Sequence, residues 1–395
     1  MEKFVKVILK PGKEQSVMRL HPWIFSGAIR RIDGSPAEGD VVEVFSDAGE
    51  YLASGHYQIG SITVRIFSFR QVNPDYNFWK EKILNAYNLR KSLNLTDNPD
   101  NNVYRLLHGE GDGAPGLIVD YYNGLVVMQM HSVGMYRIRE TIAGVIQELY
   151  GSGLVAIYDK SESTVPFKAN LGAKNGFLHG NQPAIEICET GCMFRIDAVT
   201  GQKTGFFIDQ RENRQLLTRY VKDRQVLNVF CYTGGFSVYA LKAGAALVHS
   251  VDSSAQAMEL TSKNMQLNGF DDERHLSVTT DAFAFMNNIR DAYDVIVLDP
   301  PAFAKHQDAL NNALQGYKRL NAKAIEQIRP GGILFTFSCS QVVTRENFRK
   351  SVFAAAANTG RHVRILHQLT QPPDHPVSIY HPEGEYLKGL VLQVE

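Results

Sequence analysis

The sequence has few cysteines, no surplus charge and no long apolar segment, and each shortage excludes a class of protein. Four cysteines in 395 residues are too few for a disulfide-bonded scaffold. The 41 basic and 41 acidic residues balance, so the protein does not coat long nucleic acid by charge alone, although a local basic groove is still compatible with this composition. No apolar run is long enough to span a bilayer.

The sequence also lacks a metal-binding pattern, a signal-peptide pattern and internal repeats. Cys188 and Cys192 lack a second close pair of cysteines or nearby histidines, so no zinc or other metal is expected. The N-terminus carries no signal-peptide pattern, and a cytoplasmic location is expected. There are no internal repeats, and hydrophobic residues make up 44% of the chain, which is enough for a sizeable core. The length predicts two or three domains.

The part of the chain before about residue 150 divides into a strand-rich segment, up to about residue 70, and a segment that mixes helices and strands. Residues 5–9, 40–45 and 61–67 are predicted as strands of a small β-barrel, because glycine and proline punctuate them. A helix is expected over residues 78–93 and a polar loop over residues 104–113. The basic face expected on that helix comprises Lys80, Lys82, Arg90 and Lys91. The other elements of this compact α+β region are expected at residues 116–120, 125–130 and 136–150.

From about residue 186 short apolar strands alternate with helices. The strands are expected at residues 226–230, 246–251, 275–278, 294–298 and 333–337, and the helices at residues 235–243 and 254–268. This alternation predicts a parallel, doubly wound α/β sheet. Residues 381–389 are predicted to turn into a last strand over residues 390–394.

Two strand ends carry candidate catalytic residues. Ser338-Cys339-Ser340 follows one apolar strand, and Asp299-Pro300-Pro301 follows another. Reacting groups collect at the carboxyl edge of an open α/β sheet, so Cys339 is a candidate nucleophile. A buried, unreactive cysteine is the competing interpretation. Cys231 is the competing nucleophile, but it lies in the turn after the first strand, where packing beside a ligand is the more common role.

The strand ends also suggest a nucleotide-like cofactor. Gly234 and Gly235 lie at a strand-to-helix turn, where the backbone can approach a ligand closely. Asp252 ends the second strand and can accept hydrogen bonds from both hydroxyls of a ribose, and Asp281 after the third strand suits an adenine amino group. A dinucleotide or S-adenosylmethionine would fit, but the full three-glycine fingerprint of dinucleotide sites is missing. Each acid taken alone is equally typical of a helix cap.

The most specific motif is Gly-Gln-Lys-Thr-Gly-Phe-Phe-Ile-Asp-Gln-Arg-Glu-Asn over residues 201–213. With it, the chain resembles class I S-adenosylmethionine-dependent methyltransferases of the large-subunit ribosomal RNA cytosine-C5 type. The resemblance implies a PUA-like RNA-binding domain over residues 1–72, a central α+β domain over residues 73–185, and a Rossmann-like catalytic domain with a mostly parallel seven-stranded sheet over residues 186–395.

The resemblance also implies site residues. Those expected to border S-adenosylmethionine are Phe207, Gln210, Arg211, Asn213, Asn228, Phe230, Tyr232, Thr233, Gly234, Gly235, Asp252, Ser253, Asp281, Ala282 and Asp299. Those expected to shape the base pocket are Pro300, Pro301 and Phe303.

The implied chemistry begins with a thiolate, from Cys339, that adds to C6 of cytosine and makes C5 nucleophilic. Asp299 would bind the exocyclic amine or ring N3. Some related enzymes carry a second cysteine after the motif proline, whereas this chain has Ala302 after Pro301. The base that removes the C5 proton is therefore unassigned.

The expected partner is 23S ribosomal RNA or the assembling large subunit, and a homodimer is possible. Basic residues near the start of the first domain would contact RNA backbone, namely Lys10, Lys13, Arg19, Arg30 and Arg31. Two alternatives remain open at this point. One is methylation of a base nitrogen, which needs no thiolate, and the other is a non-catalytic RNA-binding or ribosome-assembly factor.

Overall fold

A computed structural model describes residues 4–166, 171–270 and 273–395, which pack as two compact units. Unit 1 comprises Met1–Ile187, Ile196–Ile208 and Pro373–Gly384. Unit 2 comprises Cys188–Arg195, Asp209–Pro372 and Glu385–Glu395. Each unit therefore gathers segments that are distant in the sequence, and the three-domain division expected from the sequence stays a prediction. No helix in the described part of the chain is long and apolar enough to cross a membrane.

The N-terminal part of unit 1 is a six-stranded sheet in the order β2-β6-β5-β4-β1-β3. Its elements are β1 (Val5–Leu9), α1 (Gln15–Met18), β2 (Trp23–Phe25), η1 (Ser26–Ala28), β3 (Ile29–Asp33), β4 (Val41–Phe45), β5 (Tyr51–Tyr57) and β6 (Ile62–Ser68). The three strands expected here are confirmed. Side chains such as Val7, Val44 and Val64 alternate inward and form this sheet's own core.

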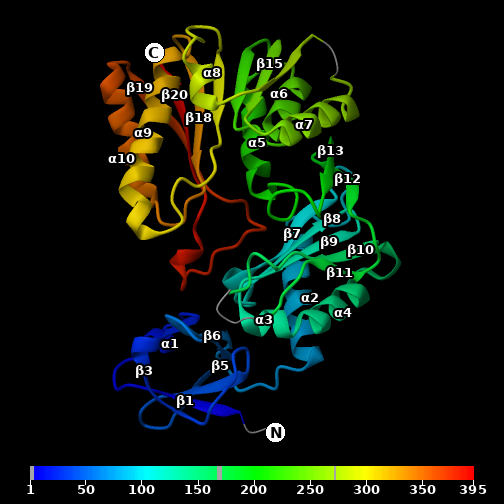
Figure 1. The fold of residues 1–395 in the computed structure, drawn as a ribbon, viewed down its shortest axis with the longest axis vertical. Coiled ribbons are helices and arrows are strands. Elements are labelled where there is room, and N and C mark those ends of the chain that lie inside the picture. Colours follow the sequence, from blue (N-terminus) through cyan, green and yellow to red (C-terminus); the bar gives the residue numbers. More distant parts are fainter. Residues whose placement is uncertain (1–3, 167–170, 271–272) are drawn as a thin grey trace. The chain divides into compact units, whose positions relative to one another are not determined.

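The rest of unit 1 is built on a five-stranded sheet in the order β11-β10-β9-β8-β7. Its elements are α2 (Tyr76–Ser92), β7 (Val103–His108), η2 (Gly109–Asp112), β8 (Leu117–Tyr122), β9 (Leu125–Met130), α3 (Val133–Arg137), α4 (Arg139–Tyr150), η3 (Gly151–Gly153), β10 (Ala156–Asp159) and β11 (Gly176–His179). Helices α2 and α4 lie side by side against this sheet (Figure 1). Trp79 and Ile83 of α2 pack into its core.

Two expectations for this region are wrong. Residues 104–113 do not form a polar loop, because residues 103–108 are strand β7 and only the remainder is a turn. Helix α2 does not present a continuous basic face, because Arg90 is fully buried. Lys80 forms an ion pair with Glu148, and Lys91 lies 3.9 Å from Asp97.

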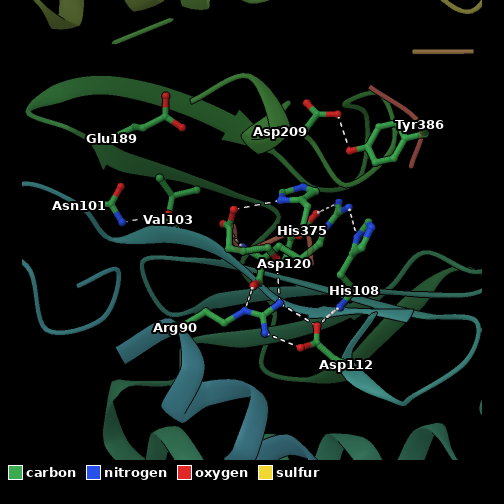
Figure 2. Close-up of polar contacts among 12 residues, drawn as sticks. Arg90, Asn101, Val103, His108, Asp112, Asp120, Glu189, Asp209, His375 and Tyr386 are labelled. Carbon is green, nitrogen blue, oxygen red and sulfur yellow. Dashed lines mark hydrogen bonds and ion pairs between the residues drawn. The ribbon is translucent and has the colours of Figure 1, made fainter. Parts of the chain in front are cut away.

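A buried ionic cluster, defined here as Arg90, Arg105, Asp112, Asp120 and Asp374, organises the polar interior of unit 1. Arg90 binds both carboxylate oxygens of Asp112, at 2.6 and 2.7 Å (Figure 2). Arg105 binds both carboxylate oxygens of Asp120, at 2.7 and 2.9 Å. Such bidentate pairs fix the orientation of both side chains.

The cluster also fastens two distant segments to the central sheet. The hydroxyl of Thr204 donates to Asp120 at 2.7 Å, which holds residues 196–208. Asp374 accepts the backbone N–H of Arg105 at 3.1 Å through its carboxylate, and its carbonyl accepts from Arg90 at 2.7 Å. Buried polar groups need hydrogen-bond partners, and those of Asp374 find theirs in unit 1, which holds residues 373–384 against this unit.

Unit 2 contains a seven-stranded sheet in the order β16-β15-β14-β17-β18-β20-β19. Its strands are β14 (Gln225–Val229), β15 (Leu247–Asp252), β16 (His275–Thr279), β17 (Val295–Leu298), β18 (Gly332–Ser338), β19 (Val363–Leu369) and β20 (Lys388–Val394). All neighbours are parallel except β20, which runs antiparallel between β18 and β19. The expected parallel strands are confirmed, and so is the last strand, although it begins at Lys388 rather than at residue 390. Its antiparallel neighbour β19 was not among the expected strands. A separate two-stranded sheet pairs β12 (Ala184–Glu189) with β13 (Cys192–Asp197).

Helices cover this sheet. They are α5 (Arg211–Leu217), α6 (Gly235–Lys242), α7 (Ala255–Leu267), α8 (Ala282–Met286), α9 (Leu310–Gln327) and α10 (Arg345–Thr359). The same part of the chain contains the 3-10 turns η5 (Ile208–Gln210), η6 (Thr218–Tyr220) and η7 (Gln307–Ala309). A further 3-10 turn, η8 (Pro382–Gly384), belongs to unit 1. Helices α9 and α10 pack side by side (Figure 1). Their buried faces, with residues such as Leu320 and Phe348, share one core with β17 and β18. The sheet's carboxyl edge is thereby held rigidly, which is what a site at that edge requires.

Candidate functional site

The turn that follows β14 has an unusual backbone. Phe230 and Tyr232 have φ values of 60° and 49°, and Gly234 has φ 76°. Non-glycine residues rarely adopt this left-handed region, and such strain is common at functional sites. A side chain at Gly234 would also place its Cβ 2.7 Å from the Cγ2 of Thr261. The turn therefore requires glycine at this position.

Polar contacts from neighbouring elements hold this turn in place. The carboxylate of Asp252 accepts the backbone N–H of Tyr232 at 3.0 Å and that of Ser254 at 3.0 Å. The hydroxyl of Thr261 donates to the carbonyl of Tyr232 at 2.8 Å, and the amide of Asn264 donates to the carbonyl of Thr233 at 2.8 Å. Asp252 is half-buried and lies directly beside the turn, as expected of strand ends that meet at one edge.

A buried ion pair that sequence reasoning missed supports the same turn from α5. The guanidinium of Arg214 binds the carboxylate of Glu189 with two hydrogen bonds of 2.8 Å, and both side chains are almost fully buried. Tyr239 donates a further hydrogen bond to Glu189 at 3.0 Å. Arg214 lies so close that a Cβ added to Gly235 would be 3.2 Å from its Cδ. Only the pairing of β12 with β13 brings Glu189 here, so nothing local in the sequence signals it.

The motif over residues 201–213 is divided between the two units. Phe207 lies in unit 1, where the ammonium of Lys203 is 4.8 Å from its ring centre. Gln210 and Asn213 lie in unit 2, both buried, with the Asn213 amide donating to Gln210 at 2.6 Å. Arg211, which begins α5, is also buried.

The hydroxyl of Tyr386 donates to the carboxylate of Asp209 at 2.8 Å (Figure 2). Asp209 is the first residue of the motif that belongs to unit 2, so this hydrogen bond links the motif to the segment directly before β20.

The third acid expected at the sheet edge has a structural role. Asp281 is exposed and caps α8, accepting the backbone N–H of Ala284 at 2.9 Å. Its second oxygen is not used by that contact. Ser253 is exposed and Ala282 is buried.

The candidate catalytic residues meet at the ends of β17 and β18. The Sγ of Cys339 lies 3.8 Å from the carbonyl oxygen of Pro300. Cys339 and Asp299 are both half-buried, and Pro301 is exposed. Adjacent parallel strands thus place the thiol beside the Asp299-Pro300-Pro301 turn, as expected. Phe303, expected to shape the base pocket, packs against the core, because its ring centre lies 4.6 Å from that of Tyr317.

Cys231, the competing nucleophile, and Cys192, another buried cysteine, are less suited to chemistry. Cys231 is 7% exposed, its Sγ lies 3.5 Å from the Sδ of Met258, and burial raises its pKa. Burial likewise raises the pKa of Cys192 to about 12. A thiol held neutral by burial is a poor nucleophile, so Cys339 is the better candidate.

Comparison with known proteins identifies the family. A model of S-adenosylmethionine-dependent methyltransferases matches residues 105–388, and a model of PUA-like domains matches residues 7–69. This chain belongs to the S-adenosylmethionine-dependent methyltransferases. It is 39% identical, over 99% of both chains, to a protein of Shewanella amazonensis named ribosomal RNA large subunit methyltransferase I. A protein of the same name from Aeromonas salmonicida is also 39% identical, over 98% of this chain and 99% of its own.

Solved structures share the fold. The structure of SMU.776 complexed with SAH has a TM-score of 0.85 and 23% identity, and the match covers 98% of this chain and 100% of that one. A methyltransferase from Streptococcus mutans has a TM-score of 0.83 at 23% identity. The class I methyltransferase fold with an N-terminal PUA-like domain is thereby confirmed, and S-adenosylmethionine is the cofactor of this methyltransferase.

The residues of unit 2 fit that cofactor. The Oδ1 of Asn228, a side chain that is 1% exposed, is buried without a hydrogen-bond partner, while its amide nitrogen donates to Ser237 at 2.9 Å. A buried acceptor without a partner is costly and suits a ligand donor. The strained turn, the carboxylate of Asp252 and this acceptor form a polar, preorganised edge of the kind that an amino acid and a ribose require.

Sequence reasoning also missed Lys388, which begins β20. Its ammonium is almost completely buried and donates to the carbonyls of Ser340 and Val343 at 2.6 and 2.7 Å. The register of β20 against β18 pairs Lys388 with Ser338. A lysine expected only in a turn is therefore placed at the strand end that carries Cys339.

Proposed function

We propose that this methyltransferase forms 5-methylcytosine in large-subunit (23S) ribosomal RNA through a covalent bond between Cys339 and C6 of the target base. The names of the relatives in Shewanella and Aeromonas support ribosomal RNA as the substrate. The observation that carries the choice of atom is the position of Cys339, a half-buried thiol 3.8 Å from the Asp299-Pro300-Pro301 turn. Methylation of a nitrogen needs no thiol at that place.

The proposed reaction has three steps, namely addition of the thiolate, transfer of the methyl group and elimination. When bound, S-adenosylmethionine supplies an electrophilic methyl group on its sulfonium sulfur. The thiolate of Cys339 forms a bond to C6, and the electron pair of the C5–C6 double bond makes C5 nucleophilic. C5 bonds to the methyl carbon as the bond from that carbon to the sulfonium sulfur breaks, so the cofactor would leave as S-adenosylhomocysteine. A base then removes the C5 proton and the bond between the Sγ of Cys339 and C6 breaks, which restores the C5–C6 double bond and the thiolate.

The other residues bind and orient. Asp299 receives a hydrogen bond from the exocyclic amine of cytosine or contacts its ring N3, while Pro300 and Pro301 shape the pocket. Asp252 accepts hydrogen bonds from the ribose hydroxyls of the cofactor, since its carboxylate lies beside the turn at Tyr232. The remaining groups proposed to border the cofactor are Phe207, Gln210, Arg211, Asn213, Asn228, Phe230, Thr233, Gly234, Gly235, Ser253, Asp281 and Ala282.

RNA backbone contacts are proposed for the first 72 residues. Lys13 and Arg19 are exposed there, whereas Arg30 pairs with Asp47 and Arg31 lies 2.8 Å from Asp33. Free cations can neutralise phosphates without first giving up a protein partner, so Lys13 and Arg19 are the better candidates. A homodimer and a cytoplasmic location stay predictions.

The test uses RNA that carries 5-fluorocytosine at the target position. Fluorine does not leave C5 as a proton does, so the enzyme should remain bonded to the RNA, and the adduct should survive denaturing electrophoresis and map to Cys339. Cys339→Ala should abolish methyl transfer but still bind cofactor.

Cys231→Ala is the matched control, because it removes a thiol from the same unit that burial keeps neutral. It should retain much of the activity. A fully active Cys339→Ala enzyme would refute the covalent mechanism and favour methylation of a base nitrogen.

A further inference from the structure

The loop between α2 and β7 borders an open pocket of about 440 Å³ in unit 1, and the proposed reaction gives this pocket no role. Pockets of roughly 300–1,000 Å³ are typical of ligand sites. Two kinds of residue line it, namely tyrosines from α2, α4, β7 and β8 and polar residues of the loop 95–102. The tyrosines are Tyr87, Tyr104, Tyr121 and Tyr150.

The tyrosine rings form a stacked group. The ring centre of Tyr121 lies 5.0 Å from that of Tyr104 and 4.6 Å from that of Tyr150, with the planes inclined by 25° and 20°. Tyr87 meets Tyr150 edge-on at 6.1 Å. Tyr104 is buried, whereas the other three side chains are partly exposed. The pocket therefore presents aromatic surface against which a further flat ring can pack.

The lining of the pocket carries little charge. Burial raises the pKa of Tyr104, Tyr121 and Tyr150, so their hydroxyls stay protonated and neutral at physiological pH. Asp97 is the one acidic residue in the described lining, and its carboxylate lies 3.9 Å from the ammonium of Lys91. The described lining contains no basic residue that could bind a phosphate. The pocket therefore suits an uncharged aromatic group.

Two buried oxygen atoms of the loop have no hydrogen-bond partner among the described residues. They are the Oδ1 of Asn101 and the Oγ1 of Thr96, in residues that are 5% and 6% exposed. The amide nitrogen of Asn101 is already used, because it donates to the carbonyl of Leu95 at 3.2 Å and to that of Val103 at 3.0 Å (Figure 2). A buried polar atom without a partner costs free energy, so a ligand that supplies N–H groups would be favoured here.

A nucleobase meets both requirements. It is flat and aromatic, every base can stack on an aromatic side chain, and its edge carries hydrogen-bond donors and acceptors. The oxygen of Asn101 would accept from such a donor, while the hydroxyl of Thr96 can donate or accept. The two oxygens belong to the same part of the loop, because Asn101 binds the carbonyl of Leu95, the residue directly before Thr96.

We propose that the tyrosine pocket, defined by Tyr87, Tyr104, Tyr121, Tyr150 and the loop of residues 95–102, binds an unpaired base of the RNA other than the base that is methylated. This inference deepens the proposed function and rests on RNA being the substrate. Proteins recognise RNA sequence mostly through unpaired bases that stack on aromatic side chains, so the pocket would help to select the RNA segment that is bound.

The test measures binding of short RNA to the full-length protein by fluorescence anisotropy. The probes are labelled single-stranded hexamers of adenosine, of cytidine and of ribose-phosphate without bases. The hexamers with bases should bind roughly 5-fold or more tightly than the chain without bases, because each stacked base contributes to affinity. Adenosine monophosphate should displace the adenosine hexamer only at a far higher concentration than the unlabelled hexamer does.

Two results of this comparison would overturn the proposal. If all three hexamers bound equally or none bound, the pocket would not recognise bases. If adenosine monophosphate competed as well as the hexamer, the ligand would be a free nucleotide rather than RNA.

Thr96→Val is the sharpest variant, because valine keeps nearly the shape of threonine and lacks only the hydroxyl. The affinity for the hexamers should fall about 2- to 10-fold, which corresponds to the loss of one hydrogen bond to the ligand. The thermal midpoint should stay level or rise, since this hydroxyl has no described protein partner to lose. A purely structural role for Thr96 predicts the reverse, a lower midpoint with unchanged affinity.

The chain offers matched controls. Thr164→Val removes a hydroxyl that donates to the carbonyl of Met130 at 2.7 Å, so it should lower the midpoint and leave RNA affinity unchanged. Tyr87→Leu should lower the affinity for the hexamers roughly 5-fold or more through lost stacking. Tyr76→Leu, at the other end of α2, should leave that affinity unchanged.

Unchanged hexamer affinity in both Thr96→Val and Tyr87→Leu would also overturn the inference. None of these measurements involves methyl transfer, so the adduct between Cys339 and 5-fluorocytosine decides the proposed reaction separately. An enzyme that forms this adduct, but whose hexamer binding responds to neither substitution, would refute the tyrosine pocket alone.

Discussion

Replacing Arg90 with methionine tests how the ionic interior of unit 1 is held together. All five N–H groups of Arg90 are used. Two reach the carboxylate of Asp112, and the others reach the carbonyls of Arg105, Ala86 and Asp374 at 2.7, 3.4 and 2.7 Å. Methionine keeps the apolar length of the side chain but removes every donor. The carboxylate of Asp112, which is 4% exposed, would stay buried, and the backbone N–H of His108 would still donate to it at 2.7 Å.

The magnitude follows from the burial of both partners. Removing one member of a fully buried ion pair costs roughly 3–5 kcal/mol, because the other charge is left uncompensated. For a unit of about 200 residues this corresponds to a fall in the unfolding midpoint of roughly 6–20 °C. Removing both charges, as in Arg90→Met with Asp112→Asn, should cost less than the sum of the single changes, since no charge is then stranded.

Differential scanning calorimetry on the full chain measures these shifts. Lys91→Met is the control, because Lys91 follows Arg90 on the same helix but its contact with Asp97 is exposed and 3.9 Å long. That substitution should change stability by no more than about 0.5 kcal/mol. If Arg90→Met shifted the transition as little as Lys91→Met, or if the double variant showed simple additivity, the assignment of the cluster as a stabilising device would be wrong.

Three other predictions concern the cofactor, the RNA and the pH dependence. Asp252→Ala should weaken S-adenosylhomocysteine binding in calorimetry roughly 10- to 100-fold by stranding ribose hydroxyls, whereas Glu326→Ala, an exposed carboxylate of the same unit, should not. Lys13→Gln and Arg19→Gln should each lower the salt dependence of RNA binding by about one unit of slope, and an unchanged slope would exclude phosphate contacts at these positions. Burial lowers the pKa of His56 to about 4, so its contribution to stability is complete above pH 6.5 and is lost as the pH falls towards 4, by up to about 3 kcal/mol. In His56→Gln, acid unfolding monitored by circular dichroism should be less steep over that interval.

The parallel strands β14 to β18 of unit 2 could be predicted because each is a short run rich in apolar residues that is followed by a helix. Strand β7 of unit 1 could not be predicted, because Arg105 and His108 interrupt its apolar pattern. Arg105 depends on distant partners, since Asp120 binds its guanidinium and Asp374 accepts its backbone N–H, and these residues lie 15 and 269 positions away in the sequence. For the same reason the helical spacing of Arg90 suggested a basic surface, whereas its side chain is buried.

The candidate site was predictable to a similar degree. The ends of consecutive parallel strands share one edge, which is why Cys339 could be placed beside Pro300 and Asp252 beside the glycine turn. Lys388 could not be assigned, because its position depends on β20 running antiparallel to β18 with residue 388 opposite residue 338. A predicted last strand adjacent to β18 was the one signal that could have drawn attention to its first residue.

The chain passes between the two units at five places, after residues 187, 195, 208, 372 and 384. Neither unit is therefore one continuous segment of the chain that recombination could exchange as a whole. A chimaera joined at residue 186 would pair the Arg105 and Asp120 of one parent with the Thr204 and Asp374 of the other. Recombinants between diverged relatives should thus fold only when both parents carry the same polar partners at these positions.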